Sequence, residues 1–317
     1  MACSSHPPPA RSPYPLRFVF GILLSFLAGT VQCLAEVRNA AYQPPPLKEY
    51  ILWYRNYDSP AIRALLELAL KKTPEYGDFR IIRSEEMGQG RVLRELAHGR
   101  TRLIDIANVA SSSERESQML AIPIPIDGGL LGFRVCVVLP QTLPLFEGVR
   151  SVEDLRERGI SIGQGLHWPD TNILKVNDIP VVTHTRYEIL FRMLRNDRFD
   201  CFARGVSEVM YDLAIENDPD LVIEPSIMLA YPMPSYFFTS PYDYLTAHRV
   251  QLGMERAIRD GSFAQFLATY YGKAIESLAL DSRTVIVLRN PFLSEESRTV
   301  GRQTLDNLQR RLQLLSQ

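Results

Sequence analysis

The sequence predicts an α/β protein made of two units that repeat the same design. Short apolar segments alternate with amphipathic ones, and this alternation runs for about 90 to 100 residues, stops and then begins again. Glycine, proline or a capping residue marks most boundaries between the segments. With 317 residues, 46% of them hydrophobic and 22% charged, the chain is long enough for two hydrophobic cores. Its formal net charge of -1 and the lack of a basic block argue against a nucleic-acid partner.

Residues 1–35 predict a cleavable signal peptide. Two basic residues, Arg11 and Arg17, precede the apolar run FVFGILLSFLAGTV, and the segment QCLA closes on a small residue, Ala35. This order is typical of secretory signals, so we expect cleavage after Ala35 and export of the mature chain. A retained membrane anchor is the alternative, because the apolar segment reaches the lower edge of the length that spans a bilayer.

The first α/β unit follows a Pro-rich spacer, residues 36–46. The run ILWYR predicts a strand, and Asp58 or Ser59 followed by Pro60 predicts the start of a helix. FRIIRS and LIDIANVA predict two further strands, and GRVLRELAHG predicts a helix between them. Strands and helices that alternate at these short intervals indicate a parallel sheet with crossover helices.

The second unit begins with FRVCVVLP, which predicts a strong strand. Further strands are predicted at ISIGQG, VVTHT, FDCFARG, PSYFFTS and TVIVL, and helices at VEDLRERG, PDTNILKV, RYEILFRMLRND and VSEVMYDLAIEN. Residues 291–317 form a tail with leucines at 305, 308, 312 and 315, which predicts an amphipathic helix. We expect this helix to pack on its own domain rather than on a partner.

Two cysteines, Cys136 and Cys201, remain after the signal peptide, and both lie in apolar strand-like runs. In an exported protein they could form one disulfide, and two buried free thiols fit the sequence equally well.

No catalytic or cofactor-binding motif is present. The sequence lacks the phosphate-binding loop and the G-x-S-x-G motif of hydrolases, and its histidines and cysteines do not have the spacing of a metal site. We therefore expect a binding protein rather than an enzyme, with no cofactor and no metal.

Polar and aromatic side chains cluster where the predicted strands end. In open α/β sheets, ligands bind beyond the carboxyl ends of the strands. Helix N-termini and arginine side chains at such positions suit a carboxylate. The ligand expected from these residue types is a small anionic or zwitterionic molecule. The candidates at these junctions are Trp53, Tyr54, Ser111, Ser113, Arg115, Trp168, Asp170, Arg204 and Glu208.

Three longer runs resemble a known family. IDIANVASSSERESQMLAIPIPI, VEDLRERGISIGQG and FRMLRNDRFDCFARGVSEV are similar, in their order and spacing, to the polar-amino-acid type of periplasmic solute-binding protein, extracellular family 3. The resemblance covers about residues 47 to 280 and implies the type II architecture, in which two α/β lobes are joined by two crossing strands with a ligand cleft between them. It places the crossing strands near Phe133–Val135 and Tyr236–Thr239. The lobes it implies are lobe 1 at 47–133 and 238–290, and lobe 2 at 134–237.

The same resemblance assigns roles to the candidate residues. Arg115 stands where the family holds the α-carboxylate of its ligand, and Ser111 and Ser113 stand where hydroxyls contact it. The loop from Leu166 to Asp170, with Trp168, would give backbone contacts. Trp53 or Tyr54 would stack on the ligand side chain. Trp168 followed by Pro169 also fits a rigid helix entry without ligand contact.

One position departs from the family pattern. Amino-acid binders of this type usually place an aspartate where this chain has Arg204, with Glu208 a few residues on. An arginine from each lobe would suit a dicarboxylate. Alternatively, Glu208 takes the ligand ammonium and Arg204 is paired elsewhere, and a purely structural ion pair at Arg204 fits equally well.

The resemblance implies an exported, periplasmic solute-binding protein. Its two lobes would close on a carboxylate-bearing solute and deliver it to an inner-membrane ABC permease. Two alternatives stay open, namely a periplasmic sensor input without a transporter and an enzyme acting on small carboxylates.

Overall fold

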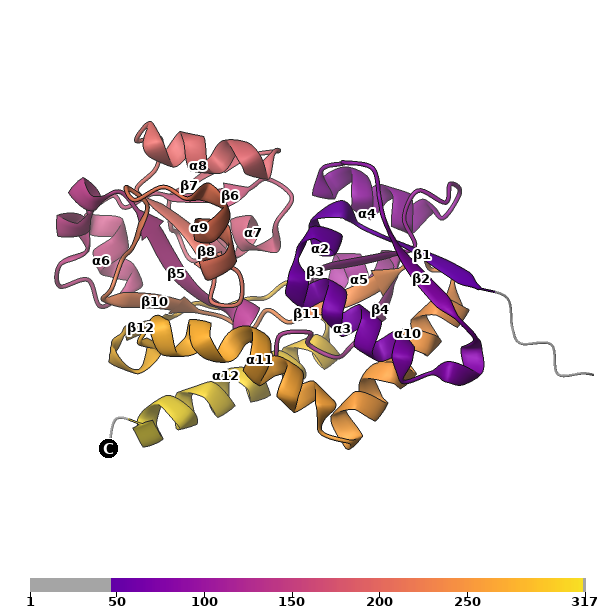
Figure 1. The fold of residues 1–317 in the computed structure, drawn as a ribbon. Coiled ribbons are helices and arrows are strands. Elements are labelled where there is room, and N and C mark those ends of the chain that lie inside the picture. The colour runs from indigo at the N-terminus through magenta and orange to yellow at the C-terminus, as the bar shows by residue number, and fades with distance from the viewer. Residues whose placement is uncertain (1–46, 316–317) are drawn as a thin grey trace, which may run out of the picture. The chain divides into compact units, whose positions relative to one another are not determined.

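The computed structural model describes the backbone of residues 47–315 and the side chains of residues 47–307. The predicted signal peptide and spacer, residues 1–35 and 36–46, lie outside these residues. The described chain forms two β-sheets with helices packed on them (Figure 1). We call the elements of the first sheet the first lobe and those of the second sheet the second lobe.

The first sheet has the strand order β2-β1-β3-β11-β4. Its first three strands are parallel, and β11 runs antiparallel to both of its neighbours. The strands are β1 (Lys48–Leu52), β2 (Phe79–Arg83), β3 (Ile106–Ala110), β4 (Leu120–Ile122) and β11 (Ser235–Thr239). The first-lobe helices are α2 (Tyr54–Asp58), α3 (Pro60–Lys71), α4 (Gln89–His98), α5 (Ser113–Gln118) and α10 (Tyr244–Arg259), with a 3-10 turn η1 (Pro74–Tyr76).

Helix α3 forms as the sequence predicts. Ser59 is its N-cap, with a hydroxyl that accepts the backbone N–H of Ile62, and Pro60 is its first residue. The residues at helical spacing that it buries are Leu65, Leu66, Ala69 and Leu70. The run ILWYR differs from the prediction, because β1 ends at Leu52 and the next residues form the single turn of α2. Trp53 therefore lies at the junction of strand and helix.

The second sheet has the order β12-β10-β5-β8-β6-β7, and β9 pairs with β5. Its strands are β5 (Phe133–Val138), β6 (Ile162–Gly165), β7 (Val181–His184), β8 (Cys201–Gly205), β9 (Val222–Ile223), β10 (Ile227–Ala230) and β12 (Thr284–Val287). Its helices and turns are α6 (Val152–Glu157), α7 (Pro169–Val176), α8 (Tyr187–Arg195), α9 (Val209–Glu216), η2 (Leu130–Gly132), η3 (Pro140–Phe146) and η4 (Leu280–Ser282). Strands β6, β7 and β8 are parallel, as their crossover helices predict.

A disulfide joins two neighbouring strands of the second sheet. Cys136 on β5 and Cys201 on β8 are buried and bonded, with their Cα atoms 5.1 Å apart. The structure thus resolves the alternative that the sequence left open. The bond cross-links residues 65 positions apart in the sequence.

The chain crosses between the sheets just before β5 and just before β11, close to the two predicted crossing strands. These segments run side by side, because the N–H of Ile126 donates to the carbonyl of Ser235 at 3.0 Å and that of Tyr231 donates to Gly132 at 3.0 Å.

The C-terminal part of the chain differs from the expected lobe boundaries. Residues 238–290 were assigned to the first lobe, but β12 pairs in parallel with β10 at the edge of the second sheet. The apolar segment TVIV covers the exposed edge of β10, which would otherwise leave backbone groups unpaired. Helix α11 (Ser262–Ser277) leads from the side of α10 toward β12 (Figure 1).

The chain then returns to the first lobe, where helix α12 (Glu295–Leu315) begins, and this helix also packs against η4. It is the amphipathic helix predicted for the tail. The Ser297 hydroxyl hydrogen-bonds Glu116 at 2.7 Å and the Tyr236 hydroxyl at 3.1 Å. Leu305 packs against the main hydrophobic core, while the side chains of the other tail leucines lie outside the described residues. The C-terminal segment therefore adds a further connection between the two lobes.

Candidate functional site

A cavity of about 270 Å³ is lined by residues of both lobes. The first lobe contributes residues from α2, the start of α3 and the end of β3. The second lobe contributes the start of β5, the start of α7 and the junction of β8 with α9, and α11 adds one wall. The site lies beyond the carboxyl ends of β3 and β8, where the sequence places it.

Arg115 is a buried cation in this cavity, with 6% of its surface exposed. It lies in α5, and its guanidinium donates to the carbonyl of Ala110, to Gln89 Oε1 at 3.1 Å and to the carbonyl of His167 at 2.6 Å. The last contact reaches the second lobe. Among the described side chains no carboxylate forms an ion pair with Arg115, and these three acceptors do not use all five donors of the guanidinium.

Burial shifts the pKa of the Arg115 guanidinium. It lowers the pKa of Arg115 to about 10, because desolvation outweighs the opposite influence of the Asp170 and Glu114 carboxylates. The guanidinium is still charged at neutral pH. A bound carboxylate would restore the lost stabilisation of the charge.

Arg204 is also buried, with 2% of its surface exposed, but it is already neutralised. Its Nε donates to Asp212 Oδ2 at 2.7 Å, and its Nη2 lies 3.1 Å from Glu208 Oε2. Burial alone would lower the pKa of Arg204, yet the two carboxylates outweigh it and raise the pKa above its ordinary value. The geometry is that of a structural ion pair and not of a free clamp.

Aromatic rings complete the surroundings of Arg204. Its guanidinium carbon lies 4.9 Å from the ring centre of Trp168 and 5.2 Å from that of Tyr187. Trp168 lines the cavity and stacks on Phe202 with an interplanar angle of 11°. Trp168 thus helps hold Arg204 in place as well as forming part of the wall.

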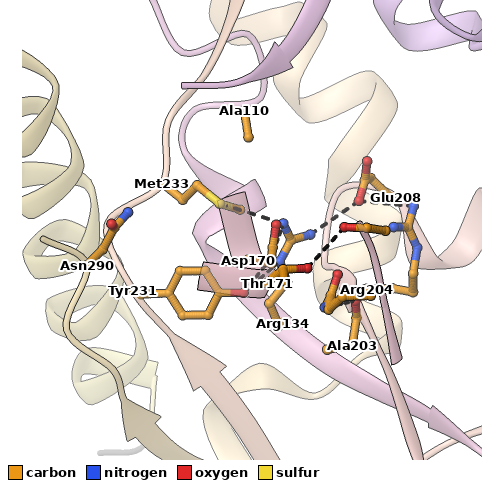
Figure 2. Close-up of polar contacts among 12 residues, drawn as sticks. Ala110, Arg134, Asp170, Thr171, Ala203, Arg204, Glu208, Tyr231, Met233 and Asn290 are labelled. Atoms are coloured by element: carbon orange, nitrogen blue, oxygen red, sulfur yellow. Dashed lines mark hydrogen bonds and ion pairs between the residues drawn. The ribbon is translucent and has the colours of Figure 1, made fainter. Parts of the chain in front are cut away.

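Asp170 and Glu208 are connected through an arginine that sequence reasoning missed, Arg134. Figure 2 shows the Arg134 guanidinium between them, 2.8 Å from Asp170 Oδ1 and 3.3 Å from Glu208 Oε2. The Tyr231 hydroxyl donates to the same Asp170 oxygen at 2.6 Å. Asp170 Oδ1 therefore has both an ion-pair partner and a hydrogen-bond donor within the protein.

Glu208 keeps one oxygen available. Both of its arginine partners, Arg134 and Arg204, contact Oε2, and among the described residues no ion pair and no side-chain hydrogen bond reaches Oε1. The side chain is 39% exposed and lines the cavity. Burial would raise the pKa of Glu208, but the two guanidinium groups lower it overall, so the carboxylate is charged at neutral pH.

The remaining predicted residues divide into two groups. Trp53 lines the cavity, and its indole N–H donates to the carbonyl of Met87 at 3.0 Å. Tyr54, Ser111 and Ser113 are not part of the lining. The Tyr54 hydroxyl donates instead to Glu188 of the second lobe at 3.1 Å.

The two serines lie at the start of α5, Ser113 being its first residue, and both are engaged elsewhere. Ser111 is fully buried and donates to Glu116, while Ser113 is exposed and donates to the carbonyl of Phe292 at 3.1 Å. These contacts anchor the C-terminal segment. No sequence pattern indicated where that segment lies.

Two further cavity residues were missed. Asp127 is buried in the first crossing segment, where it accepts the hydroxyl of Ser207 at 2.8 Å and the N–H of Gly129 at 3.0 Å. Tyr271 reaches the cavity from α11. A lone charge inside the apolar strand FRVCVV could have revealed Arg134, whereas no local pattern marks Tyr271.

Contacts between the lobes close part of the cavity mouth. The Tyr211 hydroxyl of α9 donates to the carbonyl of Asp58 at 2.7 Å. Arg55 of α2 lies 3.7 Å from the ring centre of Tyr187. The structure therefore has the lobes in contact around the site.

Comparison with known proteins shows a likeness of fold and not of sequence. No protein-family model matches the chain, and no curated protein matches it significantly. Many solved structures do match. A substrate-binding protein of an amino-acid ABC transporter from Streptococcus pneumoniae, bound to L-arginine, is 15% identical with a TM-score of 0.52, covering 72% of this chain and 96% of that one.

Two other matches have different roles. The GluR0 ligand-binding core in complex with L-glutamate is 12% identical, with a TM-score of 0.51 over 73% of this chain and 100% of that one. An ancestral amino-acid-binding protein, a precursor of cyclohexadienyl dehydratase, is 12% identical, with a TM-score of 0.51 over 70% and 95%. The predicted fold class, the two-lobed type II periplasmic binding protein architecture, is confirmed.

Neither a membrane helix nor a metal cluster is found in the described part of the chain. Among residues 47–315, no helix has the length and apolar character that a bilayer crossing needs. Within the same residues, no three His, Cys, Asp or Glu side chains are grouped so that they could hold a metal ion.

Proposed function

We propose that this chain binds a small zwitterionic, amino-acid-like solute in the cavity between its lobes. One observation carries the proposal: Arg115 is a buried guanidinium that faces the cavity without a carboxylate partner among the described residues. A buried charge without a counter-ion is costly, and a ligand carboxylate would supply the missing partner in bidentate geometry. The Oε1 atom of Glu208 is the acceptor for the ligand ammonium.

The charges of the lining favour a zwitterion over a dianion. The lining contains four arginines and four carboxylates, which are Arg55, Arg115, Arg134 and Arg204 with Asp127, Asp170, Glu208 and Asp212. Arg134 and Arg204 are neutralised by their ion pairs. A dicarboxylate would need a second unpaired guanidinium. Arg204 does not provide one, and Arg55, which has no ion pair among the described residues, is only partly buried and lies against the Tyr187 ring. This supports the alternative in which Glu208 takes an ammonium.

The expected affinity follows from the two charged groups that would hold the ligand, Arg115 and Glu208. A charge-assisted hydrogen bond contributes about 1.5 to 3 kcal/mol, and two such anchors with apolar contacts reach about -8 kcal/mol, or roughly micromolar Kd. Closure of the two lobes would bring both anchors onto the ligand. The contacts at Tyr211 and Arg55 would form as the lobes close.

Replacing Arg115 tests the proposal. Arg115→Gln keeps hydrogen-bonding capacity but removes the charge, and we expect amino-acid binding to weaken by about 10- to 100-fold in isothermal titration calorimetry. Arg94→Gln on α4 is the matched control, because Arg94 is exposed and lies outside the lining. Equal affinities for the two variants would remove Arg115 from the site.

The biological setting is also part of the proposal. Export through a signal peptide cleaved after Ala35, residence in the periplasm and delivery to an ABC permease fit the sequence and the role of one structural match. A sensor input is the second candidate, supported by the likeness to the GluR0 ligand-binding core. A mature chain beginning at Glu36, identified by mass spectrometry of the periplasmic fraction, would establish export. Turnover of a bound solute, rather than saturable binding, would favour an enzyme.

A further inference from the structure

One side of the cavity is formed by three helices that carry apolar and aromatic side chains. The hydrogen bond from Tyr211 to Asp58 holds α9 against the start of α3, and α11 packs on α3. We call this side the annex. The annex residues are Ile62 from α3, Met210 and Tyr211 from α9, and Tyr270, Tyr271 and Ala274 from α11.

The annex offers no free charge to a ligand. The charged residue that these helices contribute to the lining is Asp212, and both of its oxygens are occupied. Oδ1 accepts the Tyr187 hydroxyl at 2.6 Å, and Oδ2 accepts Arg204 at 2.7 Å. A charged ligand side chain packed on these three helices would lose its hydration without gaining a counter-ion from the helices themselves. The charged groups nearest to the annex are Arg55 beside Tyr211, and Asp127 and Glu208 beside Tyr271.

Tyr271 supplies one uncommitted polar group. Its side chain is buried, with 5% of its surface exposed, and it lines the cavity. Its ring packs edge-on against Phe266, with an interplanar angle of 88°. Its hydroxyl has no hydrogen-bond partner among the described residues, so it is free to meet a ligand or a water molecule.

We propose that the solute held at Arg115 carries a bulky uncharged side chain, aliphatic or aromatic, that packs in the annex. This inference rests on the proposed function, since it assigns the other end of the same ligand. The cavity volume of about 270 Å³ lies near the lower end of the range for small-molecule sites, which suits one amino-acid-sized molecule and not a peptide. Tyr270, Tyr271 and Ala274 come from the helix that links the two lobes, so this helix sets side-chain specificity.

A panel of L-amino acids that differ only in the side chain tests the inference by isothermal titration calorimetry. We expect phenylalanine and leucine to bind about 10- to 100-fold more tightly than alanine, because they bury an apolar side chain, and glutamate and arginine to bind more weakly than either. Tighter binding of glutamate or arginine than of phenylalanine would overturn the inference.

The panel separates the two proposals. If all members bind alike and all lose affinity in Arg115→Gln, the zwitterion site stands and the annex does not select the side chain. If no member binds the native protein, the proposed function falls and the inference falls with it.

Placing a charge in the annex tests independently whether α11 contacts the ligand side chain. Ala274→Glu should weaken phenylalanine binding by about tenfold or more and improve the relative binding of arginine. Ala268→Glu is the control, since it is the same substitution on an exposed position of α11 outside the lining. Equal ligand preferences in the two variants would show that α11 does not contact the ligand.

Discussion

Replacing Arg204 distinguishes a structural ion pair from a ligand clamp. Arg204→Met keeps a side chain of similar length and removes both ion pairs. Glu208 would retain Arg134 at 3.3 Å, but Asp212 would retain only the Tyr187 hydroxyl at 2.6 Å. A buried carboxylate left without its cation costs about 3 to 5 kcal/mol. The lost contact between the guanidinium and the rings of Trp168 and Tyr187 adds about 0.5 to 2 kcal/mol.

The free energy of unfolding in urea, followed by circular dichroism, measures this loss. The double variant Arg204→Met/Asp212→Leu removes the stranded charge and should recover most of the stability. Amino-acid affinity should fall much less in the double variant than in Arg115→Gln. Native-like stability of Arg204→Met together with abolished binding would refute the structural assignment and restore the clamp.

Two further predictions concern Gly129 and Asp127, which both lie in the first crossing segment. Gly129 has a φ of +89°, and a Cβ there would lie 2.0 Å from Thr304 Cγ2, so Gly129→Ala should destabilise the fold by about 1 to 3 kcal/mol. Gly272→Ala in α11, where a Cβ meets nothing within 4 Å, should instead stabilise by about 0.5 to 1 kcal/mol, and thermal unfolding compares the two. Burial raises the pKa of Asp127, so its charge costs stability only as pH rises above the unfolded-state value of about 4. Asp127→Asn should therefore gain stability relative to the native protein between about pH 4 and pH 7, and a constant difference in urea unfolding would contradict this.

The fold could be predicted largely because its signals are local. The capping serine and proline before α3, the apolar run of β5 and the restart of the strand–helix pattern each act over a few residues. The place of β12 could not be predicted, because nothing in TVIV distinguishes pairing with β10 from pairing in the first sheet. Such pairing depends on which strand edge is free after the rest has folded.

The position of the cavity was predictable from the strand ends, but the ion pairing of its residues was not. Arg115 was singled out through the order of motifs around it, and it lines the cavity. Whether Arg204 is ion-paired depends on the direction of two carboxylates that follow it, Glu208 and Asp212. They lie one helical turn apart, and both point back toward its guanidinium. Arg134 and Tyr271 reach the cavity from elements far apart in the sequence, and only the assembled fold brings them together.

The most direct test is a crystal structure of the complex with a tightly bound amino acid. We expect the ligand carboxylate to accept hydrogen bonds of about 2.7 to 2.9 Å from the guanidinium of Arg115, with the ammonium at Glu208. A ligand bound elsewhere, with Arg115 keeping only its contacts to Ala110, Gln89 and His167, would contradict the account.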